Sequence, residues 1–117
     1  MLREDALKGH VIVVTGGGTG LGRSMAKCFL KLGASVVITS RKQEVLDKAA
    51  TDLAMETGGA VLAVACDVRK YLEVEQLVER CVERFGKVDA LVNNAAGNFI
   101  SPTERLSSKA FEVIIDM

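Results

Sequence analysis

Glycine residues cluster within one short stretch of the sequence. Five of the 11 glycines fall within residues 16–22, which read Gly-Gly-Gly-Thr-Gly-Leu-Gly. Where such a run joins a strand to a helix, the backbone can approach a pyrophosphate closely, turn sharply and direct the first helical N–H groups at it. The spacing is Thr-Gly-x-x-x-Gly-x-Gly, with Gly16, Gly20 and Gly22 at its glycine positions. It predicts a dinucleotide-binding loop, and the alternative is a flexible strand-to-helix turn.

Basic residues are concentrated in the first third of the chain. The whole chain has 15 basic and 15 acidic residues, yet residues 6–43 contain no acid. The basic residues in that stretch are Lys8, Arg23, Lys27, Lys31, Arg41 and Lys42. They indicate an anionic ligand, and a small phosphorylated molecule fits better than nucleic acid, because few aromatic residues accompany them and the overall charge is balanced.

The residues after the second predicted strand bear on which dinucleotide binds. An NAD-binding site places Asp or Glu about 20 residues after the glycines, on the adenosine ribose. This sequence has Ser40, Arg41 and Lys42 there, and no carboxylate precedes Glu44. Guanidinium and ammonium groups suit a 2′-phosphate, so the sequence favours NADP(H). A solvated basic turn is the alternative.

A second polar group, Asp67-Val-Arg69, follows the third predicted strand. The Asp67 carboxylate could accept a hydrogen bond from adenine or cap the next helix. Arg69 could pair with a phosphate or form a surface salt bridge. The residues alone leave both pairs of alternatives open.

Apolar runs and amphipathic segments alternate along the chain and must position these groups. We predict strands over residues 10–15, 35–39, 60–66 and 90–93, and helices within residues 21–32, 45–57 and 74–85. The first helix is expected to face the sheet through Leu21, Met25, Cys28, Phe29 and Leu32. Short connections imply parallel strands with right-handed crossovers, that is, an α/β fold with a Rossmann-like doubly wound sheet. Ligands bind such sheets beyond the C-terminal ends of the strands.

The end of the sequence departs from this alternation. Residues 94–106 read as a loop, and Ser107 opens an apparent helix that runs to Met117. A sheet ending at the fourth strand would leave an unpaired edge, so we expect further chain after Met117.

Several classes of protein are excluded. The longest apolar run, residues 60–66, is far shorter than the roughly 18 residues of a membrane span. The N-terminus carries acids and lacks the apolar core of a secretory signal, so we expect a cytoplasmic protein, with an organelle possible for a longer parent chain. Cys28, Cys66 and Cys81 include no Cys-x-x-Cys pair and are expected to be buried thiols, without a metal site.

Three motifs together resemble the short-chain dehydrogenase/reductase family in order and spacing. They are the glycine run from Thr15 to Gly22, Asp67-Val68, and Asn93-Asn-Ala-Ala-Gly97. The longer string from Asn93 to Ser107, with Ser40-Arg-Lys42 and Cys66-Asp-Val-Arg69, is similar to the NADPH-dependent 2,4-dienoyl-CoA reductases of that family.

The resemblance implies hydride transfer from NADPH to a conjugated acyl-CoA in fatty-acid β-oxidation, by a protein that assembles as a homo-oligomer, commonly a tetramer. The implied cofactor-binding residues are Gly16, Gly17, Gly18, Thr19, Gly20, Leu21, Gly22, Ser40, Arg41, Lys42, Asp67, Val68, Asn93 and Ala95. The implied acyl-CoA contacts are Arg69, Phe99 and Ser107. From the residues alone, Phe99 could line an acyl groove or anchor a loop, and Ser107 suits a helix cap. Asn93 and Asn94 are expected to tether the fourth strand.

The catalytic Tyr-x-x-x-Lys pair of that family is absent. The single tyrosine, Tyr71, is followed four residues later by Glu75, and His10 begins the first strand, where we expect a structural role. No catalytic residue is therefore predicted. We expect residues 1–117 to be the N-terminal part of a single NADP-binding domain, truncated before its catalytic residues. Another short-chain reductase, such as a 3-oxoacyl thioester reductase, and a non-catalytic NADP-binding short form are the alternatives.

Overall fold

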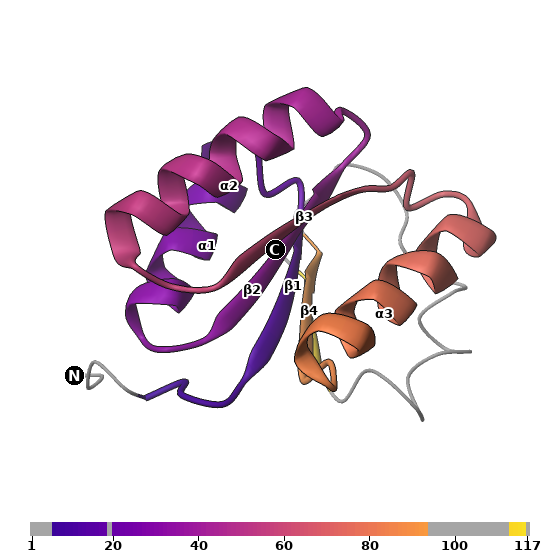
Figure 1. Ribbon diagram of the computed structural model, residues 1–117. Coiled ribbons are helices and arrows are strands. Elements are labelled where there is room, and N and C mark those ends of the chain that lie inside the picture. Colours follow the sequence, from indigo (N-terminus) through magenta and orange to yellow (C-terminus); the bar gives the residue numbers. More distant parts are fainter. Residues whose placement is uncertain (1–5, 19, 94–112, 117) are drawn as a thin grey trace.

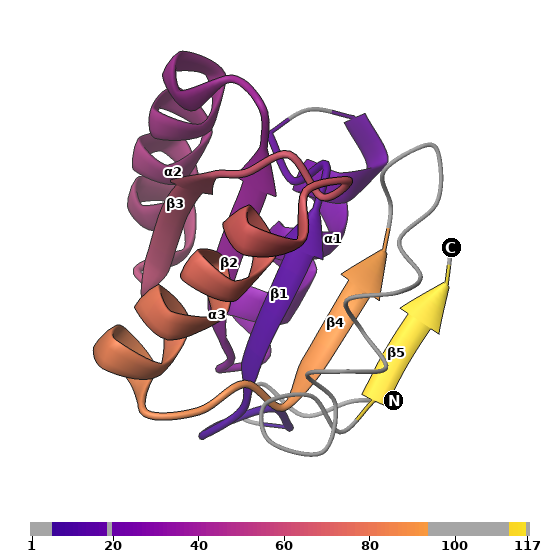
Figure 2. The same cartoon turned by 90° about the vertical axis from the view of Figure 1, so that its right-hand side faces the viewer.

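Strands and helices alternate in the computed structural model, which describes residues 6–18, 20–93 and 113–116. The elements are β1 (Val11–Thr15), α1 (Gly20–Lys31), β2 (Ser35–Ser40), α2 (Gln43–Thr57), β3 (Val61–Ala65), α3 (Tyr71–Phe85), β4 (Ala90–Asn93) and β5 (Val113–Asp116). The strands form one sheet in the order β3-β2-β1-β4-β5 (Figures 1 and 2). Every pairing is parallel, which confirms the predicted doubly wound α/β sheet.

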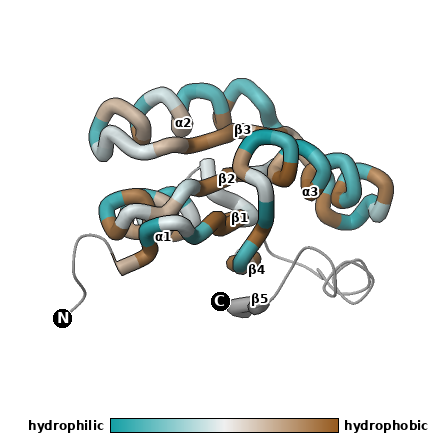
Figure 3. The backbone as a smooth tube through the Cα atoms, turned by 60° about the horizontal axis from the view of Figure 1, so that its bottom comes forward, coloured by the Kyte–Doolittle hydropathy of each residue, from teal (hydrophilic) through white to brown (hydrophobic). Residues whose placement is uncertain are grey.

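The helices cover the two faces of the sheet. Helices α1 and α2 lie on one face and α3 on the other (Figure 1). Side chains alternate along β1 accordingly: Ile12 and Val14 pack in the cluster beneath α1 and α2, whereas Val13 packs with α3. Hydrophobic segments of the strands lie between helices along which hydrophilic and hydrophobic residues alternate (Figure 3). This alternation explains why β1, β2 and β4 read as apolar runs, because these strands are largely buried on both faces, whereas β3 at the edge is mostly half-buried.

Glycines follow the last residues of α2 and α3. Gly58 and Gly86 follow α2 and α3 with φ of 72° and 87°, and their N–H groups donate to the carbonyls of Ala54 and Val82. Residues other than glycine rarely adopt this left-handed conformation, so each glycine fixes the turn into the next strand.

The predicted face of α1 is wrong in part. The residues buried against the sheet are Gly22, Ala26 and Leu30, whereas Leu21 and Cys28 are exposed. Small residues let a helix approach its sheet closely, and a search for large apolar residues overlooks them. The prediction of buried thiols holds for Cys66 and Cys81 and fails for Cys28.

The prediction of a helix over residues 107–117 is also wrong where the structure describes that segment. Residues 113–116 form β5, which pairs with β4 from Ala90↔Val113 to Asn93↔Asp116. Val-Ile-Ile is a short β-branched run, and such runs suit strands as well as buried helices. Pairing with the otherwise open edge of β4 favours the strand. Residues 94–112 lie outside the described part.

Side-chain hydrogen bonds connect β1 to β4 and to Asp89, the residue before it. At the C-terminal edge, Thr15 Oγ1 donates to the Val92 carbonyl at 3.3 Å and to Asn93 Oδ1 at 3.2 Å. At the opposite edge, the Val11 N–H donates to Asp89 Oδ2 at 2.7 Å. Asn93 thus tethers the fourth strand as predicted, and Asn94 lies outside the described residues.

Candidate functional site

Two adjoining cavities lie at the C-terminal edge of the sheet, where β1, β2 and β3 end. The first, of about 300 Å³, is lined by Thr15, Gly16, Thr39, Ser40, Arg41, Cys66, Asp67, Val68 and Arg69. The second, of about 520 Å³, is lined by Gly16, Gly18, Ser40, Arg41, Lys42 and Val45. Gly16, Ser40 and Arg41 line both cavities. The C-terminal end of β2 therefore lies between the two cavities. Their sizes are those of small-molecule sites.

The glycine run forms one wall, and two of its glycines pack closely against neighbouring side chains. A Cβ atom on Gly17 would lie 2.6 Å from Ile38 Cγ2, and one on Gly18 would lie 3.1 Å from Val45 Cγ1. Gly16 and Gly20 have φ of 68° and 56°. A Cβ on Gly20 would meet no atom of the described protein within 4 Å. The loop therefore packs tightly on its inner side and is open on its outer side, which fits a bound phosphate group.

The backbone at the start of this loop is tied to β2. The Gly16 N–H donates to the Thr39 carbonyl at 2.7 Å. The Thr39 hydroxyl is fully buried in the wall of the first cavity. It makes no hydrogen bond of normal geometry with the described residues. It lies near the Cys66 thiol, whose pKa it lowers against the larger effect of burial. A buried hydroxyl in this position can donate to or accept from a ligand.

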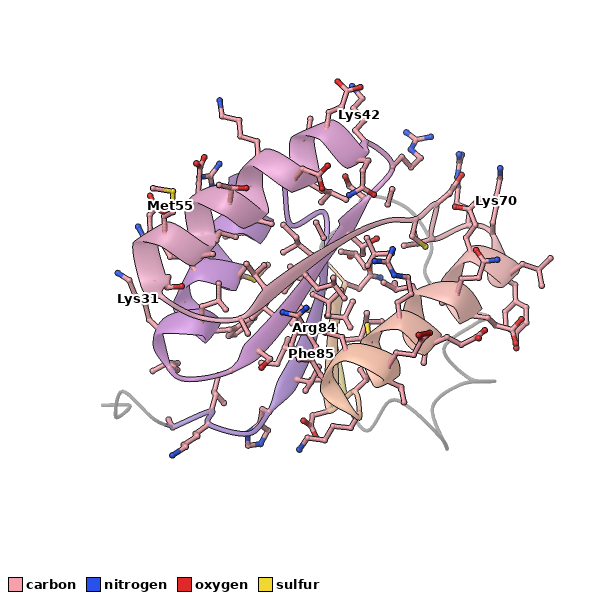
Figure 4. All side chains as sticks on the ribbon, viewed as in Figure 1. Lys31, Lys42, Met55, Lys70, Arg84 and Phe85 are labelled. Carbon is pink, nitrogen blue, oxygen red and sulfur yellow. The ribbon has the colours of Figure 1, made fainter. Side chains whose placement is uncertain are left out.

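The six basic residues of the first third separate into different groups. On α1, Arg23 pairs with Asp52 of α2 at 3.1 Å, and Lys27 pairs with Glu56 at 3.8 Å, so these charges join two helices. Lys31 at the end of α1 and Lys42 before α2 lie at opposite ends of this layer (Figure 4).

Only two of the six line the cavities. Arg41 and Lys42 are exposed, and neither has a carboxylate within 4.0 Å in the part of the chain that the structure describes. After the hydrogen bonds and charge of Arg69, the charge of Arg41 also lowers the pKa of Asp67.

Asp67 and Arg69 form a tight pair on the other side of the first cavity. Arg69 Nε and Nη2 donate to the two Asp67 carboxylate oxygens, both at 3.0 Å, and the Arg69 N–H donates to Asp67 Oδ1 at 3.0 Å. The guanidinium and backbone hydrogen bonds hold the pKa of Asp67 well below its usual range. The Asp67 side chain is 13% exposed and that of Arg69 is 68% exposed. Of the alternatives for Arg69, the ion pair is therefore the one that this structure contains.

Asp67 does not cap the following helix, so that alternative is wrong. The residue before α3 is Lys70, whose N–H donates to the Asp67 carbonyl at 2.9 Å in a tight turn. Instead, Glu73 of the first helical turn accepts a hydrogen bond from the Asp67 N–H at 2.9 Å. This contact fixes the backbone at Asp67 and leaves its carboxylate on the cavity wall.

Cys66 is a further ionisable group that lines the first cavity. Burial, followed by the charge of Glu73, raises the pKa of Cys66 to about 11, so the thiol stays protonated at neutral pH. Across the described residues, no group of three His, Cys, Asp or Glu side chains could hold a metal ion. Tyr71 begins α3, and His10 precedes β1 at the far edge of the sheet. In the same residues, no helix is long and apolar enough to cross a membrane.

The cavities bring together most, but not all, of the predicted site. Predicted residues that line them are Gly16, Gly18, Ser40, Arg41, Lys42, Asp67, Val68 and Arg69. Gly17 is buried within the loop, and Gly20, Leu21 and Gly22 lie in the first turn of α1. Asn93 accepts a hydrogen bond from Thr15. Thr19, Ala95, Phe99 and Ser107 lie outside the described residues.

Sequence reasoning missed four lining residues: Thr15, Thr39, Cys66 and Val45. Each stands at the end of a strand, just after one, or in the first turn of the helix that follows. That position along a parallel sheet is the signal that could have identified them.

Comparison with known proteins agrees with this architecture. The chain is 47% identical over 118 residues to a probable (3E)-enoyl-CoA-producing 2,4-dienoyl-CoA reductase 3 of Caenorhabditis elegans, covering 100% of this chain and 38% of that protein. It is 39% identical over 115 residues to a peroxisomal 2,4-dienoyl-CoA reductase of Arabidopsis thaliana, covering 98% and 38%. An L-sorbose reductase of Gluconobacter frateurii, solved with NADPH and L-sorbose, superposes with a TM-score of 0.76 at 38% identity, covering 81% of this chain and 36% of that one.

The chain thus spans 38% of the length of both reductases that it matches. The family model for short chain dehydrogenases matches residues 10–117, nearly the whole sequence. A parallel sheet with a glycine loop after β1 is the structural counterpart of that match. The chain belongs to the short-chain dehydrogenase family.

Proposed function

We propose that this chain forms the NADP(H)-binding part of an NADPH-dependent reductase that acts on 2,4-dienoyl-CoA. The observation that carries the cofactor assignment is the end of β2, where Arg41 and Lys42 line the second cavity and have no ion pair within the described residues. A guanidinium forms strong, charge-assisted hydrogen bonds with a phosphate. NADH lacks the 2′-phosphate, so these two cations would favour NADPH over it.

The residues present fit a dinucleotide in an extended arrangement. The backbone of residues 16–22 would hold the pyrophosphate, with Thr19 and Leu21 in that loop. Ser40, Arg41 and Lys42 would hold the 2′-phosphate. Asp67 and Val68 would hold the adenine, and Asn93 and Ala95 would complete the site beside β4. When bound, the nicotinamide cofactor supplies a hydride to the substrate.

The substrate assignment is supported by the names of the two reductases above and by one feature of this chain. Arg69 is 68% exposed at the cavity rim, and its guanidinium could bind a phosphate of an acyl-CoA while Asp67 orients it. We propose Phe99 and Ser107 as further acyl-CoA contacts. The relative named as peroxisomal supports an organellar setting as an alternative to the cytoplasm. We further propose that the reductase works as a homo-oligomer.

We propose that residues 1–117 bind cofactor without completing catalysis. Reduction of a conjugated thioester needs a group that stabilises the developing enolate and a proton donor. The sequence contains no Tyr-x-x-x-Lys pair, and the pKa of the Cys66 thiol at the site is about 11, too high for an efficient proton donor at neutral pH. These residues would therefore contribute cofactor binding and substrate contacts to the domain.

Calorimetric titration of the natural full-length chain with NADPH and with NADH tests the cofactor assignment. We expect NADPH to bind at least about tenfold more tightly, which is the effect of one charge-assisted phosphate contact. Equal affinity would overturn it. Turnover of 2,4-dienoyl-CoA, compared with a 3-oxoacyl-CoA at equal concentration, tests the substrate assignment, and preferred turnover of the 3-oxoacyl-CoA would overturn that part.

A further inference from the structure

Gln43, the first residue of α2, contacts the free edge of the sheet. Strand β3 stands at the end of the strand order, and its inner edge pairs with β2. Gln43 Oε1 accepts a hydrogen bond from the Ala65 N–H at 3.0 Å, and Gln43 Nε2 lies 3.5 Å from the Ala63 carbonyl oxygen. The side-chain amide thus engages the backbone groups that a further strand would engage.

Asp47 fixes the orientation of this amide. Its Oδ1 accepts a hydrogen bond of 2.7 Å from Gln43 Nε2, one helical turn away. A carboxylate accepts hydrogen bonds and does not donate them, so the amide nitrogen must face Asp47. The amide oxygen is then directed at the Ala65 N–H.

The two cations at the site lie between two residues that are both hydrogen-bonded to the end of β3, at Cys66 and at Ala65. On one side, Ser40 is in register with Ala65, and its carbonyl accepts a hydrogen bond of 2.7 Å from the Cys66 N–H. On the other side, Gln43 binds the Ala65 N–H. Only Arg41 and Lys42 separate the two anchors.

Other side-chain hydrogen bonds at this helix start are weak, although Leu46 in the first turn of α2 is buried in the core. Lys42, which precedes α2, makes no side-chain capping hydrogen bond. Its N–H reaches Ser40 Oγ only at 3.4 Å. Packing of Leu46 holds the first turn of α2 on the face of the sheet, and Gln43 adds the side-chain hydrogen bond that ties this turn to the edge of β3.

We propose that Gln43 is a positioning residue for cofactor selectivity, which holds Arg41 and Lys42 where they recognise the 2′-phosphate. This inference rests on the proposed NADP(H) function. A guanidinium has its full effect on a phosphate only when its approach is fixed, because less conformational freedom is then lost on binding. Loss of the anchor should weaken NADPH binding and leave NADH binding nearly unchanged.

The test replaces Gln43 by methionine in the natural full-length chain. Gln43→Met keeps the length of the side chain and its helix propensity but removes both hydrogen bonds to β3. We expect the dissociation constant of NADPH to rise about fivefold or more, within the range of one charge-assisted contact, and that of NADH to change less than about twofold. The matched control is Gln76→Met, at an exposed position of α3, which should change neither constant.

Asp47→Ala separates positioning from simple charge. Removing an acid near two cations strengthens binding of an anion if charge alone matters. Positioning predicts the opposite, because the amide of Gln43 loses its fixed orientation, so NADPH binding should weaken. Equal losses of NADPH and NADH affinity in Gln43→Met, or tighter NADPH binding in Asp47→Ala, would overturn the inference.

Arg41→Ala, measured in parallel, distinguishes the two levels of the proposal. If it lowers the preference for NADPH while Gln43→Met and Asp47→Ala do not, the positioning role fails and the proposed cofactor stands. If Arg41→Ala leaves the preference unchanged, both fail.

Discussion

Replacing Gly17 by alanine tests how closely the glycine loop is packed on β2. The added Cβ would lie 2.6 Å from Ile38 Cγ2, 2.7 Å from Ile38 Cβ and 3.2 Å from the Val14 carbonyl oxygen. Favourable carbon–carbon contacts lie near 3.5–4.0 Å, so the loop or the strand must move by roughly an ångström. Ile38 is fully buried and cannot turn into solvent. Overpacking of this kind costs about 1–3 kcal/mol.

Urea unfolding of the natural full-length chain, followed by circular dichroism, measures this cost. We expect the free energy of unfolding to fall by that amount at an unchanged m-value. The matched control is Gly18→Ala, whose Cβ would lie 3.1 Å from Val45 Cγ1, on a side chain that is 37% exposed and can yield. Its cost should stay below about 1 kcal/mol. If Gly18→Ala costs as much as Gly17→Ala, the packing argument is refuted.

Asp89→Ala removes the acceptor of the Val11 N–H and should lower the free energy of unfolding by about 1–3 kcal/mol at pH 7. The net effect of burial, which raises the pKa, and of the hydrogen bonds to Asp89, which lower it, is a pKa below its usual value. The stabilising contribution of Asp89 is therefore present above the unfolded pKa of about 4 and is lost as pH falls through the folded pKa. The difference in free energy of unfolding between the variant and the parent should narrow in acid. A difference that does not depend on pH would contradict this. A thiol reagent at pH 8 should modify the exposed Cys28 quickly and reach Cys66 and Cys81 only on unfolding. Burial raises the pKa of Cys66 to about 11 and that of Cys81 to about 12. Equal modification rates for all three thiols in the folded protein would be inconsistent with the burial of Cys66 and Cys81.

The sequence was sufficient for the parallel sheet because local signals there agree with the tertiary structure. Strands β1, β2 and β4 are largely buried on both faces and read as apolar runs. The helix ends at Gly58 and Gly86 require a left-handed residue. It was insufficient for residues 113–116, because a short apolar run suits either element and the choice depends on pairing with β4. The face of α1 was misjudged since Gly22 and Ala26 carry no hydrophobic signal.

The site was predictable where a residue type has one main use. A glycine run after a predicted strand and basic residues after the next strand can be recognised from the local sequence. Contacts between distant segments are not: Gln43 meets Ala65 across 22 positions, and nothing in the local pattern indicates it. The choice between partners for Arg69 was likewise open, because it depends on the tight turn that brings its guanidinium back to Asp67.

The most direct test of the central claim is the ratio of NADPH to NADH affinity in the parent chain and in Arg41→Asp. Arg41 lines both cavities, and the substitution replaces a cation beside the expected 2′-phosphate with an anion that repels it. We predict that the preference for NADPH falls at least about tenfold, the equivalent of one lost charge-assisted contact, while NADH binding is retained. An unchanged preference would show that the end of β2 does not select the cofactor and would contradict the account.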